Sequence, residues 1–406
     1  MDNNEKKVKD IPENTETKKE NKEKKEKKPM TKKKKTLLII LCILLAFFLF
    51  VGGFAVWYVN DKLNKIEYET EQTTIDPNKE FVDDETIDFA EMDDATGSTY
   101  KEILKNWATN KGEKMSNKNV LNILLIGSDA SAEESGRASI TDKGNTDVMM
   151  LVSIDKKNET IKLVSFMRDS YTYMDQFDSY GKLNAACANG GAPFLVETIE
   201  TDYKIEIDGY ALVDFDSFRA VIDILGGVQI DVPKYVANHL TNKIDGTFPS
   251  GEGVTLNGEQ ALKFVRVRAT DKDGDVSRVD RQKQVIKALI EKAKGASLSE
   301  INEVFDAVLA NVRTNIPKKD ILNYATKAVT EGWATFEIAE EITMPTADAR
   351  YGYSSAATAW IWVIDYPLAA QKLQLELYGE TNINLPEERK TAIDVIGGYV
   401  SKETTD

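Results

Sequence analysis

Residues 37–59 form an apolar run without a charged side chain, LLIILCILLAFFLFVGGFAVWYV. Twenty-three residues at a helical rise of about 1.5 Å per residue are enough to cross the roughly 30 Å hydrocarbon core of a bilayer. Trp57 and Tyr58 at its far end suit the membrane interface. A cleavable signal peptide would have a shorter apolar core, of about 7–15 residues, followed by an A-x-A site. The run therefore predicts one transmembrane helix that is retained in the protein.

Lysines on the N-terminal side of this run predict its orientation. Residues 1–36 hold fourteen lysines against eight acidic residues, and lysines 32–35 stand directly before the run. By the positive-inside rule this side stays in the cytoplasm, so we expect a type II anchor with everything after Asn60 outside. The whole chain nevertheless has a net charge of −15. Its outer part is therefore acidic, which argues against a nucleic-acid partner.

Few residues are available for thiol or imidazole chemistry. Cys42 lies inside the apolar run and Cys187 in the outer part, so the two cannot form a disulfide with each other. His239 is the single histidine. This composition argues against a structural zinc site and against serine–histidine catalysis. Carboxylates and arginines must then carry any chemistry.

Short apolar runs alternate with helical patterns after residue 119. Strands are predicted at residues 120–126, 147–154, 160–166, 205–213 and 228–232. The polar residues 156–158 predict a hairpin turn between the second and third of these. Helices are predicted from the N-cap Asp216, at 257–265, at 276–294, and after Ser297, which forms a capping box with Glu300. The order predicts an α/β domain, an α/β/α sandwich-like arrangement of a mixed central sheet with flanking helices, preceded by one transmembrane helix.

Composition also suggests how the chain is divided. We expect a disordered Lys/Glu-rich cytoplasmic tail at 1–36, a transmembrane signal anchor at 37–59, and an extracytoplasmic stalk or accessory segment at 60–118 with a short helix near 99–109. The main domain is expected at 119–378, followed by a polar C-terminal tail at 379–406.

Two aspartates stand at the ends of predicted strands. Asp129 follows the strand 120–126, and Asp147 opens the strand 147–154 after Asn145. If these strands are antiparallel neighbours, both carboxylates share one rim of the sheet. Two or three oxygen ligands together with substrate phosphates suit Mg²⁺, which needs few protein ligands. The alternative is that each aspartate only caps a strand or a turn.

Arginines concentrate in two further segments. Arg168 and Asp169 follow the strand 160–166, either as a surface ion pair or with Arg168 facing a phosphate that Asp169 helps to orient. Arg266 and Arg268 stand two residues apart, so in extended backbone they would point to the same side. Arg278, Arg281 and Gln282 share one face of the following helix. Because the planar guanidinium binds phosphate oxygens bidentately, the cluster predicts a pyrophosphate site. The alternative is a set of ion pairs with aspartates 271, 273, 275 and 280.

Six segments, in this order, resemble those of the LytR–CpsA–Psr family: NILLIGSDAS, TDVMMLVSID, IKLVSFMRDSY, GKLNAACANGG, IDGYALVDFDSFRAVIDILGGVQIDV and LNGEQALKFVRVRATDKDGDVSRVDRQKQVIKAL. The resemblance covers about residues 119–378. It implies a catalytic domain with an α/β/α-like fold and a hydrophobic groove for a polyprenyl chain. It also implies a Gram-positive, membrane-anchored phosphotransferase. This enzyme would move a polyprenyl-pyrophosphate-linked glycopolymer, such as teichoic acid or capsular polysaccharide, onto the C6 hydroxyl of peptidoglycan muramic acid.

The resemblance also assigns roles to single residues. Asp129 and Asp147 would ligate Mg²⁺, with Mn²⁺ as the alternative ion. The residues that would hold the pyrophosphate are Arg168, Arg266, Arg268, Arg278, Arg281 and Gln282. Arg168, Arg268 and Asp169 would be catalytic, and Asp169 would position the acceptor or take its proton. Asn145 stands where the family usually has arginine, and Met167 where it usually has proline.

The partners implied are the lipid-linked glycopolymer, peptidoglycan and membrane lipid. Two alternatives stay open at this point. One is hydrolysis of the polyprenyl pyrophosphate, with water in place of the sugar hydroxyl. The other is a non-catalytic protein that binds lipid or wall polymer and regulates wall assembly.

Overall fold

The computed structural model describes most of the chain after residue 59. The described residues are 60–68, 80–81, 94–110, 112–128, 146–242, 246–267, 275–308, 312–354, 360–389 and 391–396. They belong to a single unit, residues 59–406. The predicted span 37–59 and the site candidates Asp129, Asn145 and Arg268 lie outside the described residues. Among the helices that are described, none is long and apolar enough to cross a membrane.

Seven strands form one mixed sheet in the order β1-β10-β7-β2-β3-β4-β11. Their bounds are β1 Glu67–Tyr68, β10 Val312–Thr314, β7 Gly209–Asp214, β2 Val120–Ser128, β3 Thr146–Asp155, β4 Thr160–Phe166 and β11 Glu337–Met344. β2, β3 and β4 are successively antiparallel, whereas β7 runs parallel to β2 and β11 parallel to β4. The predicted hairpin is confirmed. The Asp155 carboxylate stabilises its turn by accepting bonds from the amides of Lys157 and Asn158, at 2.9 and 3.0 Å.

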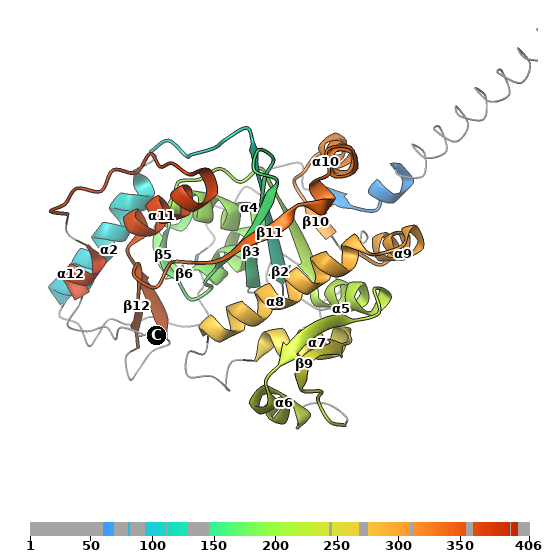
Figure 1. Ribbon diagram of the computed structural model, residues 1–406. Coiled ribbons are helices and arrows are strands. Elements are labelled where there is room, and N and C mark those ends of the chain that lie inside the picture. The colour runs from blue at the N-terminus through green and yellow to red at the C-terminus, as the bar shows by residue number, and fades with distance from the viewer. Residues whose placement is uncertain are drawn as a thin grey trace, which may run out of the picture. The chain divides into compact units, whose positions relative to one another are not determined.

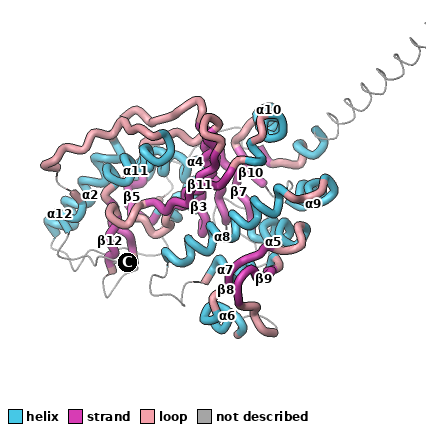
Figure 2. Tube along the Cα trace, viewed as in Figure 1, coloured by secondary structure: helices cyan, strands magenta, loops and turns pink. Residues whose placement is uncertain are grey.

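Helices cover both faces of this sheet (Figure 1; Figure 2). On one face lie α4 (Leu183–Tyr203), α2 (Asp94–Thr109) and α11 (Tyr366–Tyr378), and on the other α8 (Asp275–Lys294) and α5 (Phe215–Ile224). Alternate side chains of β3 show the two layers. Met149 and Leu151 belong to the core that α4 shares, while Met150 and Val152 pack in the cluster that α8 shares. The predicted mixed α/β fold with flanking helices is therefore confirmed.

The remaining elements form small pairs and peripheral helices. The further strands are β5 Tyr171–Met174, β6 Ser179–Lys182, β8 Val228–Val232, β9 Gly251–Leu256, β12 Arg350–Tyr353 and β13 Ile361–Ile364. The further helices are α6 Lys234–Thr241, α7 Gly258–Arg266, α9 Leu298–Val308, α10 Lys318–Thr330 and α12 Ala392–Ile396, with the 3₁₀ turns η1 Asp175–Phe177 and η3 Trp333–Thr335. β8, β9, α6 and α7 share a hydrophobic core of their own with α5, at the lower side of Figure 1.

Helix starts follow the predicted capping chemistry at Ser297 and depart from it at α5. The Asn257 side chain accepts from the Gln260 amide, and the Ser297–Glu300 capping box is present. At α5 the N-cap is Asp214, whose carboxylate accepts from the Ser217 amide at 2.7 Å, and not Asp216 as predicted. The strand before it is also shorter than the predicted 205–213. The reason is that Ile205 forms an isolated bridge with Met115 outside the sheet.

Segments at both ends of the described chain contribute to the core around α4. Helix α2 includes the helix predicted near 99–109, and its Tyr100 and Leu104 are buried there. In the predicted polar tail, Ala392 and Ile396 of α12 are buried in the same core. Figure 1 shows α2, α11 and α12 gathered at one side of the molecule.

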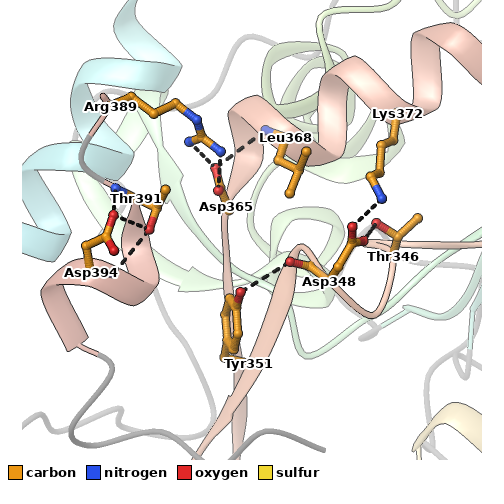
Figure 3. A network of polar contacts seen from close by, with 9 residues as sticks. All are labelled: Thr346, Asp348, Tyr351, Asp365, Leu368, Lys372, Arg389, Thr391 and Asp394. Carbon is orange, nitrogen blue, oxygen red and sulfur yellow. Dashed lines mark hydrogen bonds and ion pairs between the residues drawn. The ribbon is translucent and has the colours of Figure 1, made fainter. Parts of the chain in front are cut away.

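A buried ion pair fastens the C-terminal segment (Figure 3). Arg389 donates from Nη1 and Nη2 to the two carboxylate oxygens of Asp365, at 2.7 and 2.5 Å. Asp365 is buried and is also the N-cap of α11, where it accepts from the Leu368 amide. One carboxylate therefore starts a helix and holds the chain that leads to α12.

Arg389→Lys is expected to lower the free energy of unfolding by about 1–3 kcal/mol, because a single ammonium cannot make two parallel bonds to a buried carboxylate. Urea denaturation measures this change. Lys372→Met is the matched control, since Lys372 pairs with Asp348 at the surface and its loss should cost about 0.5 kcal/mol or less. Equal effects of the two substitutions would contradict the structural role of Arg389.

A second buried carboxylate lies between α4 and β5. Asp202 is fully buried, and the Thr172 hydroxyl oxygen lies 2.9 and 2.8 Å from its two carboxylate oxygens. Burial raises the pKa of Asp202 from its ordinary value of 3.8 to about 7, although the Thr172 bond and the nearby Lys204 oppose the rise. Desolvation dominates here because the charged form has lost its water.

This raised pKa predicts that the protein loses stability as pH rises. Between about pH 4 and 7 the folded state keeps a proton on Asp202 that the unfolded state releases. Asp202→Asn is therefore expected to be more stable than the parent by about 2–4 kcal/mol at pH 8. At pH 4 the two proteins should unfold alike. Thermal unfolding at both pH values measures the difference, and a pH-independent difference would show that Asp202 does not titrate in this way.

Candidate functional site

The site begins where β2 and β3 end side by side. The two strands are antiparallel neighbours, and Ser128 pairs with Thr146 after a register shift at Gly127. The sequence left open whether these two strands are antiparallel neighbours, and the structure shows that they are. Asp147 therefore lies at the rim of the sheet. Asp129 follows Ser128 directly in the chain but lies outside the described residues.

Side chains from two other elements converge on Asp147. Arg168 donates from Nη1 to Asp147 Oδ1 at 2.8 Å, and Arg278 Nη1 lies 3.5 Å from the same oxygen. Gln282 donates from Nε2 to the Asp147 carbonyl at 3.1 Å. Arg278 is only 2% exposed. Residues 278 and 282 thus share one face of α8, as predicted, and this face meets the rim of the sheet.

The loop that carries Arg168 is held by three elements. Met167 N–H donates to the Met344 carbonyl of β11 at 2.8 Å, and Trp362 N–H of β13 donates to the Asp169 carbonyl at 2.9 Å. The Asn184 amide of α4 donates to the Arg168 carbonyl at 3.1 Å. The Met167 bond needs an N–H group that proline lacks. Methionine at this position therefore adds a contact between the loop and β11.

Asp169 lies between two cations. Its Oδ2 is 3.3 Å from Arg168 Nε, and its Oδ1 is 3.3 Å from Lys182 Nζ. Asp169 and Lys182 are 6% and 5% exposed. A carboxylate between two cations is held in one orientation by both of them. The geometry therefore favours Asp169 as a group that orients the Arg168 guanidinium toward Asp147.

Arg281 and Arg266 have different surroundings from this centre. Arg281 is buried and donates from Nη2 to the Val267 carbonyl at 2.5 Å, so it braces the backbone that leads to Arg268. Arg266 is the last residue of α7, and the backbone becomes extended only at Val267. The condition under which Arg266 and Arg268 would point to the same side is therefore not met at Arg266. The Arg266 side chain is exposed, and its guanidinium lies 5.0 Å from the centre of the Phe215 ring.

An apolar cavity adjoins the Asp147 centre. It has a volume of about 220 Å³ and lies between the sheet and helices α5, α7 and α8. Representative lining residues are Val148, Phe215, Phe218, Leu262, Ile286 and Leu289. Asp214 and Gln282 are the polar residues in its lining. Gln282 therefore borders the cavity and contacts Asp147 at the same time, which joins an apolar space to a polar, arginine-rich rim.

A sequence model of the LytR_cpsA_psr family matches residues 86–363. The chain belongs to this family.

Two curated relatives and one solved structure give the extent of this similarity. The chain is 40% identical over 181 residues to the polyisoprenyl-teichoic acid–peptidoglycan teichoic acid transferase TagV of Bacillus subtilis, covering 43% of this chain and 46% of TagV. It is 34% identical over 216 residues to the transferase TagU of Bacillus anthracis, covering 53% of this chain and 67% of TagU. The structure of TagT bound to LI-WTA matches with a TM-score of 0.52 and 26% identity, over 66% of this chain and 94% of that chain. The chain thus spans about half of TagV and about two thirds of TagU.

Within this LytR_cpsA_psr domain, Lys182 is the site residue that the sequence did not reveal. Lys182 stands thirteen residues after Asp169, and side chains at this separation on one helix or one strand do not lie side by side. The β5–β6 hairpin pairs Tyr171 with Lys182 and so brings the lysine back beside the Arg168–Asp169 loop. A prediction of the β5–β6 hairpin, with α4 beginning at Leu183, would have placed Lys182 next to the loop.

The carboxylate oxygens described at the rim of the sheet provide only part of a binding site for a hard cation such as Mg²⁺. Within the described ranges there is no group of three or more histidine, cysteine, aspartate or glutamate residues that could hold a metal. Asp147 is the described carboxylate of the predicted pair, and arginines approach its Oδ1. Because Mg²⁺ takes few protein ligands when phosphates supply the others, Asp147 and the predicted Asp129 are the residues that would hold this ion.

Proposed function

We propose that the chain is a membrane-anchored transferase that moves a polyprenyl-pyrophosphate-linked wall glycopolymer, teichoic acid in the first place, onto peptidoglycan. The similarity to the teichoic acid transferases TagV and TagU supports this substrate class. The observation that carries the proposal is the position of Gln282, which borders the apolar cavity and bonds to Asp147. A substrate with an isoprenoid chain and a pyrophosphate needs an apolar space next to a cationic rim.

The chain's own residues supply most of what the reaction requires. The C6 hydroxyl oxygen of muramic acid forms a bond to the sugar-linked phosphorus, and the bond from this phosphorus to the bridging oxygen breaks. A phosphodiester forms, polyprenyl phosphate leaves, and the hydroxyl proton passes to the leaving phosphate or to water. Arg168 and Arg278 would hold the pyrophosphate and neutralise the charge that grows on the leaving phosphate. Arg266, Arg268 and Arg281 complete the proposed pyrophosphate-binding set.

Asp147 and Asp129 would hold Mg²⁺, or Mn²⁺ in its place. When bound, the ion would add positive charge next to the phosphate oxygens. The guanidinium groups of Arg168 and Arg278 flank Asp147 Oδ1 and so hold the carboxylate in place at the rim of the sheet.

The apolar run 37–59 would anchor the enzyme as a type II membrane protein with its domain outside the cell. Donor lipid and product lipid both stay in the membrane, so an anchored enzyme meets its substrate in two dimensions. Membrane lipid, the glycopolymer donor and peptidoglycan are therefore the proposed partners, in a Gram-positive cell envelope.

The test uses the full chain in lipid vesicles with Mg²⁺, a polyprenyl-pyrophosphate-linked teichoic acid and peptidoglycan oligomers. Mass spectrometry would identify the phosphodiester-linked product. We expect product with the parent and with Arg219→Ala, which removes a surface arginine paired with Asp216 and Glu259, but not with Arg168→Ala. Released sugar phosphate without product would favour the hydrolase. Lipid binding without turnover would favour the non-catalytic regulator.

Filling the apolar cavity should weaken use of long lipid substrates. Leu289 of α8 lines the cavity, and Leu289→Trp is expected to raise KM for the polyprenyl substrate by about tenfold or more, since the chain loses apolar surface to bury. A soluble donor with a short lipid should be turned over as before. Leu375→Trp, at an exposed position of α11, is the control. An unchanged KM for Leu289→Trp would place the lipid elsewhere.

A further inference from the structure

A lysine lies on the face of α8 that packs against the sheet. This face is otherwise apolar, since Val279 is buried and Ile286 and Ile290 pack in the hydrophobic cluster over β3 and β4. Lys283 stands between them at helical spacing and is only 6% exposed. Lysine is rarely buried unless its ammonium has partners, because the charged group loses its water. A polar group is therefore retained where an apolar side chain would pack.

The Lys283 ammonium joins α8 to β11. Its Nζ donates to the Thr343 hydroxyl oxygen at 2.9 Å and lies 2.8 Å from Asp280 Oδ1 on the preceding turn of α8. The Asp280 side chain is 54% exposed, so water screens this ion pair. The bond to Thr343 crosses to another element, and α8 packs against β11 in the fold (Figure 1).

The end of β11 also holds the loop that carries Arg168. Thr343 and Met344 are adjacent, and the Met344 carbonyl accepts from the Met167 amide at 2.8 Å. β11 runs parallel to β4, the strand that leads into this loop. Two adjacent residues of one strand therefore fasten both of the elements that direct arginines to Asp147.

The spacing of these arginines depends on the position of α8. Arg168 Nη1 lies 2.8 Å from Asp147 Oδ1, whereas Arg278 Nη1 lies 3.5 Å from the same oxygen, at the outer limit of a hydrogen bond. Gln282, the residue before Lys283, donates to the Asp147 carbonyl at 3.1 Å. A shift of the first turns of α8 by about 1 Å would break the longer contact, and misplacement of this size can lower a rate by about a hundredfold.

We propose that Lys283 is a positioning residue for the transfer reaction. Through Thr343 it fixes the first turns of α8 on the end of β11, and Met344 fixes the Arg168 loop on the same strand. β11 thus sets the distance between Arg168 and Arg278. This role rests on the proposed function, in which both arginines hold the pyrophosphate.

Thr343→Val and Thr343→Ser separate the hydrogen bond from packing. Valine keeps the size of threonine without the hydroxyl, whereas serine keeps the hydroxyl and loses a methyl group. In the full chain in lipid vesicles, Thr343→Val should lower kcat/KM for transfer about tenfold or more, and Thr343→Ser should stay within about twofold of the parent. The affinity for inorganic pyrophosphate with Mg²⁺, measured by isothermal titration calorimetry, should follow the same order. The opposite order would indicate a packing role and overturn the proposal.

Lys283→Met tests the other partner of this bond, since methionine keeps an apolar stem and lacks the ammonium. It should lower kcat/KM as much as Thr343→Val, and the double variant should lose no more than either single one, because both changes remove one bond. Lys287→Met is the matched control. Lys287 ties α8 to Glu341 of the same strand one turn further along, at 2.6 Å, and its loss should change kcat/KM by about twofold or less.

Circular dichroism and thermal unfolding show which variants are folded. Parent-like kcat/KM in folded Lys283→Met and Thr343→Val proteins would overturn the positioning role. An equal loss with Lys287→Met would also overturn it, because any contact between α8 and β11 would then serve. A parent that binds pyrophosphate but forms no transfer product would overturn the proposed function. The pyrophosphate affinities of the variants would then still decide whether Lys283 spaces the arginines.

Discussion

Replacing Arg278 by lysine is expected to reduce kcat/KM for glycopolymer transfer by about a hundredfold or more, although the positive charge is kept. Arg278 is almost fully buried in the first turns of α8, and its guanidinium lies 3.5 Å from Asp147 Oδ1. A planar fork in this place can bind a phosphate and approach the carboxylate together. A lysine ammonium is a point charge on a flexible stem and cannot do both.

The vesicle assay described for the proposed function measures this loss, and circular dichroism with thermal unfolding shows whether α8 remains folded. Arg219→Lys is the matched control, because Arg219 pairs with Asp216 and Glu259 at the surface of α5. It should leave kcat/KM within about twofold of the parent. An Arg278→Lys enzyme that is folded and fully active would remove Arg278 from the pyrophosphate site.

Lys182→Met is expected to destabilise the fold by about 3–5 kcal/mol, since it leaves the Asp169 carboxylate buried with one of its two cations removed. The loss should be specific to the pair. Lys287→Met, which removes an ion pair with Glu341 near the surface, should cost about 0.5 kcal/mol or less. Urea denaturation at neutral pH measures both.

A double-mutant cycle with Asp169→Asn separates the interaction energy between Lys182 and Asp169 from the loss of packing around each side chain. If Lys182 stabilises Asp169, the free energy of unfolding should fall less in the double variant than the sum of its falls in the two single variants. Transfer activity should stay low in every variant that lacks Asp169, because Arg168 then loses the carboxylate that orients its Nε. Strictly additive losses of stability would show that Lys182 and Asp169 do not act together.

Local patterns predicted the elements whose signals lie within a few neighbouring residues. The β3–β4 hairpin followed from its polar turn, and the capping box at Ser297 followed from Glu300 three positions later. The shared face of Arg278 and Gln282 followed from helical spacing alone. Helix α7 ends one residue beyond the predicted 257–265, so Arg266 is helical, and the spacing of the two arginines alone did not indicate this.

The family, the alternation of strands and helices, and the arginines, carboxylates and amides available for chemistry can all be recognised in the amino-acid sequence. These properties depend on the order and spacing of residues along the chain. The folded structure was needed to show that Lys182 joins Asp169, that Gln282 links the cavity to Asp147, and that residues 60–68 contact α9 and α10. Such contacts join residues that are distant in sequence. They depend on strand order and helix packing, which no local pattern encodes.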